Sequence, residues 1–232
     1  MLSTIRTTTA PICVVAFGLL GCSDPTANVE QADVGEAQEP AAAASASAIY
    51  FALNDESKVE FTGSKVTGSH DGGFSNVTGE FAVSDGKLED TGNKIVIDMT
   101  SVWSDNNRLT GHLKNADFFD IASYPVAVFE TTEVTDAGVT GNLTLHGVTK
   151  SISFTPEIEV TPDSVSVRAE FAIQRFDFNI EYPGRADDLI RDGVAIRLDV
   201  SASQGRADMD AFVAAAESAA DAYAAAAAPG GG

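Results

Sequence analysis

The sequence is poor in cysteine and in basic residues, and each shortage excludes a class of protein. Its only two cysteines, Cys13 and Cys22, lie near the start of the 232-residue chain, so the remainder forms neither a disulfide nor a thiolate metal site. Lysine and arginine number 14 against 34 aspartates and glutamates, which leaves a formal net charge of −20. Such a chain repels nucleic-acid phosphates and lacks a basic patch for anionic lipid. We therefore expect no nucleic-acid partner and a solvated acidic surface.

Long apolar runs are also missing, apart from one short run close to the N-terminus. Ala10 to Leu20 is about eleven residues long, whereas a membrane-spanning helix needs about 20. A segment that carries Arg6 and no acid precedes this run, which is the order of a secretory signal. The run ends in Leu19-Leu20-Gly21-Cys22, which resembles the bacterial lipobox, whose cysteine is acylated and becomes the mature N-terminus.

This resemblance predicts a lipoprotein signal peptide over residues 1–21 and a lipid attached to Cys22. The alternative is an ordinary secretory signal with a chance cysteine. Ser23 rather than aspartate follows the cysteine, which by resemblance to known sorting signals implies the periplasmic face of the bacterial outer membrane. Two or three acyl chains would anchor the protein stably there.

Two further segments contain few large apolar side chains. Residues 22–48 hold Asp, Glu, Gln, Pro and a run of Ala, and this composition predicts an acidic flexible tether. Residues 204–232 are rich in Ala and end in three glycines. Because Ala is the strongest helix former, we expect a weakly packed helix at about 208–228, with a second unstructured tail as the alternative.

The body, residues 49–203, has an apolar period of two, which is typical of β-strands. Turn signals separate the alternating runs. They predict eight strands near 59–61, 79–83, 95–99, 126–134, 141–145, 151–158, 164–175 and 194–200. Only Asn107 to Ala116 looks helical. Strands at this regular spacing predict an all-β fold, and we interpret it as a single eight-stranded antiparallel barrel with short helical insertions, with a sandwich as the alternative.

Alternation also assigns the two faces of each strand. One face is charged, with Asp98, Arg168 and Asp199, and the other is apolar. Eight closed strands enclose either packed side chains or one small ligand. The predicted inward, ligand-binding side chains are Phe61, Ile97, Met99, Trp103, Phe129, Leu143, Leu145, Phe171, Ile173 and Ile196.

Three motifs within this body resemble the YceI-like family. Residues 115–125 read N-A-D-F-F-D-I-A-S-Y-P, with His112, Leu113 and Phe129 in register. Residues 141–150, G-N-L-T-L-H-G-V-T-K, look like the hairpin of that family, and residues 175–178 look like its R-x-D-F element. The resemblance covers about residues 59–202. It implies a lipocalin-like barrel in the bacterial envelope and an elongated apolar ligand, such as a polyisoprenoid or a fatty amide. The lipobox departs from the periplasmic signal of many members.

Chemically active residue types are present but do not form a catalytic pattern. Residues 68–73, G-S-H-D-G-G, place Ser, His and Asp next to one another, where they cannot converge on one reacting atom. We interpret this segment as a glycine-rich loop at the mouth of the barrel, with His70 as a candidate contact for a ligand head group. The three histidines lack the spacing of a zinc site, so we predict no metal.

Arg175 is the one charged residue that alternation places inside. A buried guanidinium needs a carboxylate, backbone carbonyls or a ligand phosphate as its partner. Asp177, two residues on, is one candidate. Arg175 therefore either seals one end of the barrel or contacts a ligand head group.

These observations favour a binding protein rather than an enzyme, since no nucleophile or acid–base pair faces inward. We expect a membrane-tethered periplasmic carrier of a polyisoprenoid or fatty-acyl lipid, held in the lumen without a cofactor. A filled barrel that binds a protein partner in the envelope is the alternative, and a lipid-modifying enzyme is a weaker one. The oligomeric state stays open.

Overall fold

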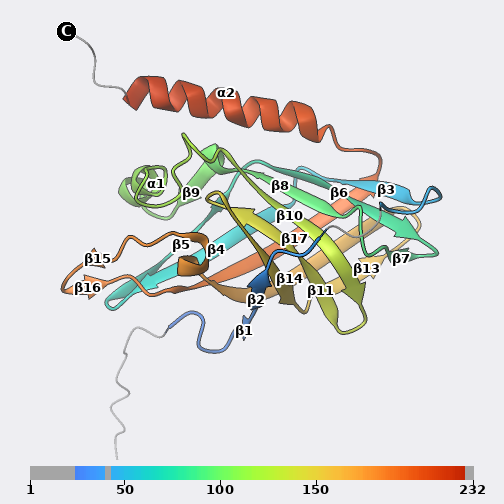
Figure 1. Cartoon of the computed structure of the whole chain (residues 1–232), viewed down its shortest axis with the longest axis horizontal. Helices are drawn as coiled ribbons and strands as arrows, with labels where there is room; N and C mark the ends of the chain where they lie inside the picture. The colour runs from blue at the N-terminus through green and yellow to red at the C-terminus, as the bar shows by residue number, and fades with distance from the viewer. Residues whose placement is uncertain (1–23, 40–42, 228–232) are drawn as a thin grey trace, which may run out of the picture.

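The computed structural model describes residues 24–39 and 43–227, and its body is a strongly curled β-sheet (Figure 1). The long strands are β3 (Ile49–Leu53), β4 (Lys58–Lys65), β5 (Gly68–Phe74), β6 (Val77–Ser84), β8 (Lys94–Asp98), β10 (Val126–Thr135), β11 (Gly138–Leu145), β12 (Val148–Phe154), β14 (Ser164–Gln174) and β17 (Gly193–Gln204). The short strands are β1 (Glu30–Gln31), β2 (Asp33–Glu36), β7 (Lys87–Leu88), β9 (Val102–Ser104), β13 (Glu157–Val160), β15 (Gly184–Arg185) and β16 (Asp188–Leu189). The helices are α1 (Asn107–Leu113) and α2 (Met209–Ala227), with 3-10 turns η1 (Met99–Ser101) and η2 (Arg175–Phe178).

The sheet is antiparallel throughout its long strands, and this confirms the all-β prediction. Its main path is β2-β12-β11-β10-β8-β6-β3-β17-β4-β5-β9, and β14 pairs with the other side of β17. β17 first pairs with β4 and then, at its C-terminal end, with β3. One strand thus joins the two parts of the curled sheet.

The register of β14 and β17 shows why the sheet has one apolar face. Phe171 lies opposite Ile196, and both are on the inner face. The pair Arg168 and Asp199, three positions away, lies on the outer face, where the two side chains form an ion pair at 3.1 Å. Because side chains alternate along a strand, a shift of one residue would move the whole apolar set into water.

The predicted count of eight strands is too low. All eight predicted strands are present, but β3 and β5 are additional long ones, and the described sheet contains 15 strands with the short ones. β5 is the segment that we interpreted as a glycine-rich loop. Its glycines are needed for packing: a Cβ on Gly72 would collide with the Phe61 ring, and one on Gly73 would lie 2.9 Å from the Trp103 ring. Composition alone therefore misidentified a strand that is covered by aromatic rings.

The N-terminal segment corrects the prediction of a flexible tether. β1 pairs in parallel with β14, and β2 pairs antiparallel with β12, so residues 30–36 lie between these two strands. Ala32 is buried, and its amide donates to the carbonyl of Ala172 at 2.9 Å. Glu36 accepts a hydrogen bond from Lys150 at 2.9 Å. The open edges of β12 and β14 provide hydrogen-bond partners for the backbone of this segment. The segment is therefore ordered although its composition is polar.

Removal of this segment is expected to destabilise the body. A chain that begins at residue 43 would leave the edges of β12 and β14 unpaired and uncover the core beneath Ala32 and Val34. We expect a lower urea midpoint and more aggregation than in a chain that begins at residue 24. Urea unfolding with light scattering measures both. Equal midpoints would mean that the segment adds no stability.

The Ala-rich tail forms the predicted helix and packs on the sheet. α2 lies along one side of the sheet, next to β8 and η1 (Figure 1). Ala216 and Ala220 are buried, and the Tyr223 hydroxyl donates to Oδ1 of Asn115 at 2.8 Å. Neither helix of the described ranges has both the length and the apolarity that a membrane span requires.

Candidate ligand-binding cavity

The inner face of the curled sheet encloses an apolar cavity of about 180 Å³. Strands β4, β8, β10, β11, β12, β14 and β17 contribute its wall, together with Phe74 of β5 and residues around α1. The structure places nine of the ten predicted inward residues on this wall, namely Phe61, Ile97, Met99, Phe129, Leu143, Leu145, Phe171, Ile173 and Ile196. Their role in binding a ligand stays a prediction.

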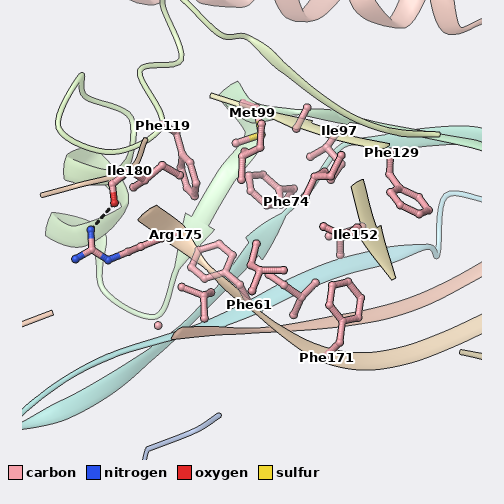
Figure 2. Close-up of a pocket in the computed structure, with 18 of the residues that line it drawn as sticks. Phe61, Phe74, Ile97, Met99, Phe119, Phe129, Ile152, Phe171, Arg175 and Ile180 are labelled. Carbon is pink, nitrogen blue, oxygen red and sulfur yellow. Dashed lines mark hydrogen bonds between the residues drawn. The ribbon is translucent and has the colours of Figure 1, made fainter. Parts of the chain in front are cut away.

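Seven of the residues that line this cavity are phenylalanines, several of which Figure 2 shows. The rings of Phe61, Phe74 and Phe119 pack against one another, with centroids 5.9 to 6.2 Å apart. At the other end, Phe154 stacks on Phe171 at 4.2 Å. Such a wall favours long apolar chains because it offers dispersion contacts and few directional polar partners.

Sequence reasoning missed several residues of the wall. Ile152 and Phe154 follow the alternation of β12 and were available from that signal. Phe118 and Phe119 lie in the turns after α1, where no periodicity predicts the direction of a side chain.

Trp103 is the one predicted wall residue that lies elsewhere. Val102 is buried, whereas Trp103 is 37% exposed and its ring covers Gly73. The prediction extended the alternation of β8 through Met99 to Trp103. The turn η1 interrupts that strand, so the alternation restarts at β9 with the opposite parity.

Arg175 lies at the end of the cavity opposite Phe129 and Phe171 (Figure 2). Its side chain is 4% exposed and donates to the carbonyl oxygens of Ile180 at 2.5 Å, Arg191 at 3.1 Å and Ile190 at 3.4 Å. Burial lowers the pKa of Arg175, while the charges of Asp192 and Glu181 oppose this shift. Arginine nevertheless stays charged, so the cavity ends in a buried cation. Its hydrogen bonds go to backbone carbonyls and not to Asp177.

Arg191 is a second cationic residue at this end. It lines the cavity, donates to the carbonyl of Lys65 at 2.9 Å, and lies 3.6 Å from the carboxylate of Asp24. Hydrogen bonds from the backbone and hydroxyl of Thr26 lower the pKa of Asp24, and the charge of Arg191 adds to this effect. The first described residue of the chain is thus bound to the wall of the cavity.

His70 does not belong to this site. It lies on β5 rather than in a loop, and its Nδ1 is 2.8 Å from Oδ1 of Asp105. Its side chain is not part of the cavity wall, although its register partner Gly63 on β4 is. Arg175 and Arg191, rather than His70, are the cations at the cavity.

Other proteins share this fold. A chain titled BcnA, from Burkholderia cenocepacia, superposes with a TM-score of 0.55 at 20% identity, over 64% of this chain and 97% of that one. A structure from Saccharophagus degradans, titled as a polyisoprenoid binding domain implicated in plant cell wall breakdown, gives 0.56 at 19% identity, over 68% and 99%. These similarities concern the fold.

Curated relatives are similar in sequence over shorter stretches. A UPF0312 protein of Vibrio parahaemolyticus is 37% identical over 91 residues, which is 37% of this chain and 48% of the relative. A UPF0312 protein of Pseudomonas putida is 40% identical over 90 residues, 36% and 46% of the two chains. The chain therefore spans about half the length of these relatives. The model of the YceI-like domain matches residues 50–202, more than half of the chain, and the protein belongs to the YceI-like family.

Proposed function

We propose that this protein binds an elongated apolar lipid, a polyisoprenoid or a fatty-acyl compound, in the cavity of the curled sheet. The observation that carries the proposal is the composition of the wall. Apart from Gly63, Arg175 and Arg191, every lining residue is apolar. The polyisoprenoid-binding description of the Saccharophagus neighbour supports the same ligand class.

Energetics favour an occupied cavity. An empty apolar cavity costs a folded protein about 24 cal/mol per Å³, so 180 Å³ corresponds to about 4 kcal/mol. Each CH₂ group that moves from water into such a space contributes about 0.8 kcal/mol. A chain of several such groups offsets the cost without polar contacts. The cavity also argues against the alternative of a barrel filled by its own side chains.

The side chains of the cavity wall are not of the types that catalysis uses. Nucleophilic catalysis and acid–base catalysis need a hydroxyl, thiol, carboxylate or imidazole near the reacting atom, and the wall contains none of these. The guanidiniums of Arg175 and Arg191 bind anions and do not exchange protons at neutral pH. Binding and transfer are therefore the proposed activity.

The proposed location is the periplasmic face of the outer membrane, with a lipid anchor on Cys22. Cys22 and the predicted signal peptide lie outside the described residues. The lipobox-like sequence before Ser23 supports this part of the proposal.

Native mass spectrometry of the full chain from its own host, with extraction of bound lipid, tests the function. We expect one long-chain lipid per protein molecule. Lipid-free protein that also takes up no added prenol or fatty acid would refute the proposal.

A charge on the cavity wall is expected to remove ligand binding. Leu143→Asp places a carboxylate without a partner on the wall. An apolar ligand would have to bury this charge, which costs more free energy than the contact provides. The control Thr144→Asp changes the next residue of β11, whose side chain bonds to Thr149 on the outer face. Titration with a fluorescent fatty acid should show loss of uptake in the first variant only. Equal binding by both variants would contradict an internal site.

A further inference from the structure

The end of the cavity that carries Arg191 also carries three exposed apolar side chains. Val66, at the turn between β4 and β5, is 57% exposed, and Leu189 of β16 is 50% exposed. The two residues are neighbours, because the amide of Val66 donates to the carbonyl of Leu189 at 3.2 Å. Phe176 of η2 is 48% exposed, and its ring lies 4.4 Å from the Arg175 guanidinium. We refer to Val66, Phe176 and Leu189 as the tip patch.

The tip patch borders the cavity. Ile190 and Arg191, which follow Leu189 directly, both line it. Lys65, which precedes Val66, is bridged to Ile190. The opposite end of the cavity adjoins a second core cluster that shares Ile95 with the wall and includes Phe51, Phe81 and Val200, and a smaller pocket lies there beside Phe129 and Phe154.

The described N-terminal segment begins at the same place. Asp24 is held there by Arg191, and Thr26 lies 3.0 Å from the position of a Cβ on Gly193. Cys22 precedes Asp24 by two residues in the sequence, and two residues of chain span at most about 7 Å. Since residues 24–39 pack on the sheet, an acyl chain on Cys22 would hold this end of the body against the bilayer rather than on a long tether.

We infer that the tip patch is a membrane-docking surface that inserts into a zwitterionic phospholipid bilayer and turns the Arg191 end of the cavity toward the lipid. The inference rests on the proposed lipid anchor at Cys22. Three side chains alone would bind a bilayer weakly. Once the lipid anchor is in the bilayer, however, their insertion is an intramolecular step at a high effective concentration. The surroundings favour a zwitterionic surface, because the carboxylates of Asp24, Asp187, Asp188 and Asp192 balance the cations Lys65, Arg175, Arg185 and Arg191.

The consequence is a direct path from membrane to cavity. A lipid that leaves the bilayer beside the hydrogen-bonded pair Val66 and Leu189 would meet Ile190 and then the phenylalanine wall without crossing water. Docking therefore adds a route of ligand entry to the proposed binding function.

Depth-dependent quenching of a fluorophore tests this orientation. The full-length lipoprotein, with Val66→Cys labelled by an environment-sensitive fluorophore, is reconstituted in vesicles of phosphatidylcholine and phosphatidylethanolamine with spin-labelled lipid. No cysteine follows Cys22 in the sequence, so the labelled site is unique once Cys22 is acylated. The control is Ala137→Cys in the exposed turn between β10 and β11.

We expect quenching at Val66 that is about threefold or more above that at Ala137, with a blue-shifted emission. Equal weak quenching at both sites, or an intact mass without acyl chains on Cys22, would overturn the inference. The two proposals fail separately: quenched Val66 in a protein that holds no lipid would refute the carrier and leave the docking surface standing.

Discussion

Replacement of Gly63 by leucine is expected to abolish lipid binding and at the same time to stabilise the protein. Gly63 belongs to the cavity wall on β4, and a Cβ at this position would meet no heavy atom within 4 Å. The leucine side chain would therefore enter the cavity and occupy the space of the ligand. Gly63→Leu fills part of an empty volume and reduces the freedom of the unfolded chain, which together contribute about 1–2 kcal/mol.

This stabilisation corresponds to a rise in Tm of about 3–6 °C for the ligand-free protein. The matched control is Gly35→Leu on β2, where the Cβ also meets no atom but faces solvent. The control should bind lipid like the unchanged protein. Scanning calorimetry and a fluorescent fatty-acid titration measure the two effects. Undiminished binding by Gly63→Leu would show that the ligand occupies another site.

Alternation of apolar residues was sufficient to predict part of this cavity. It located eight strands, and their parity placed nine residues on the wall, because a half-buried strand must alternate. The same rule failed at Trp103, where η1 interrupts the strand. Asp98 accepts a hydrogen bond from the amide of Thr100 at 2.9 Å, so Asp-x-Thr was the signal of this turn.

The remaining differences depend on partners that are distant in the sequence. β5 is rich in glycine because the Phe61 and Trp103 rings lie on its two faces, and its own composition resembles a loop. The segment of β1 and β2 has the composition of a disordered tether, and its order comes from the edges of β14 and β12. No local pattern predicts that an edge more than 100 residues away is free. The position of Asp24 beside Arg191, and with it the docking surface, followed only from the structure.

Loss of the buried cation at the end of the cavity is expected to destabilise the protein strongly. Arg175→Met removes the guanidinium group that donates hydrogen bonds to the carbonyl oxygens of Ile180, Ile190 and Arg191. Each unsatisfied buried group costs about 1–3 kcal/mol, and removal of a buried charge offsets part of the sum. We expect the free energy of unfolding to fall by about 2–4 kcal/mol. Urea unfolding measures this, with Arg168→Met as the control.

Arg168 lies on the outer face of the same strand in an exposed ion pair with Asp199, so its loss should change stability by less than about 1 kcal/mol. The Arg175 variant also tests what the cation does for a ligand. An apolar chain along the phenylalanines would place its head near the guanidinium, where a carboxylate or phosphate is stabilised and an alcohol is not. The unchanged protein should therefore bind a fatty acid about tenfold more tightly than the matching alcohol, and Arg175→Met should bind both alike. An unchanged preference in the variant would limit Arg175 to holding the segment from Ile180 to Arg191 across the end of the cavity.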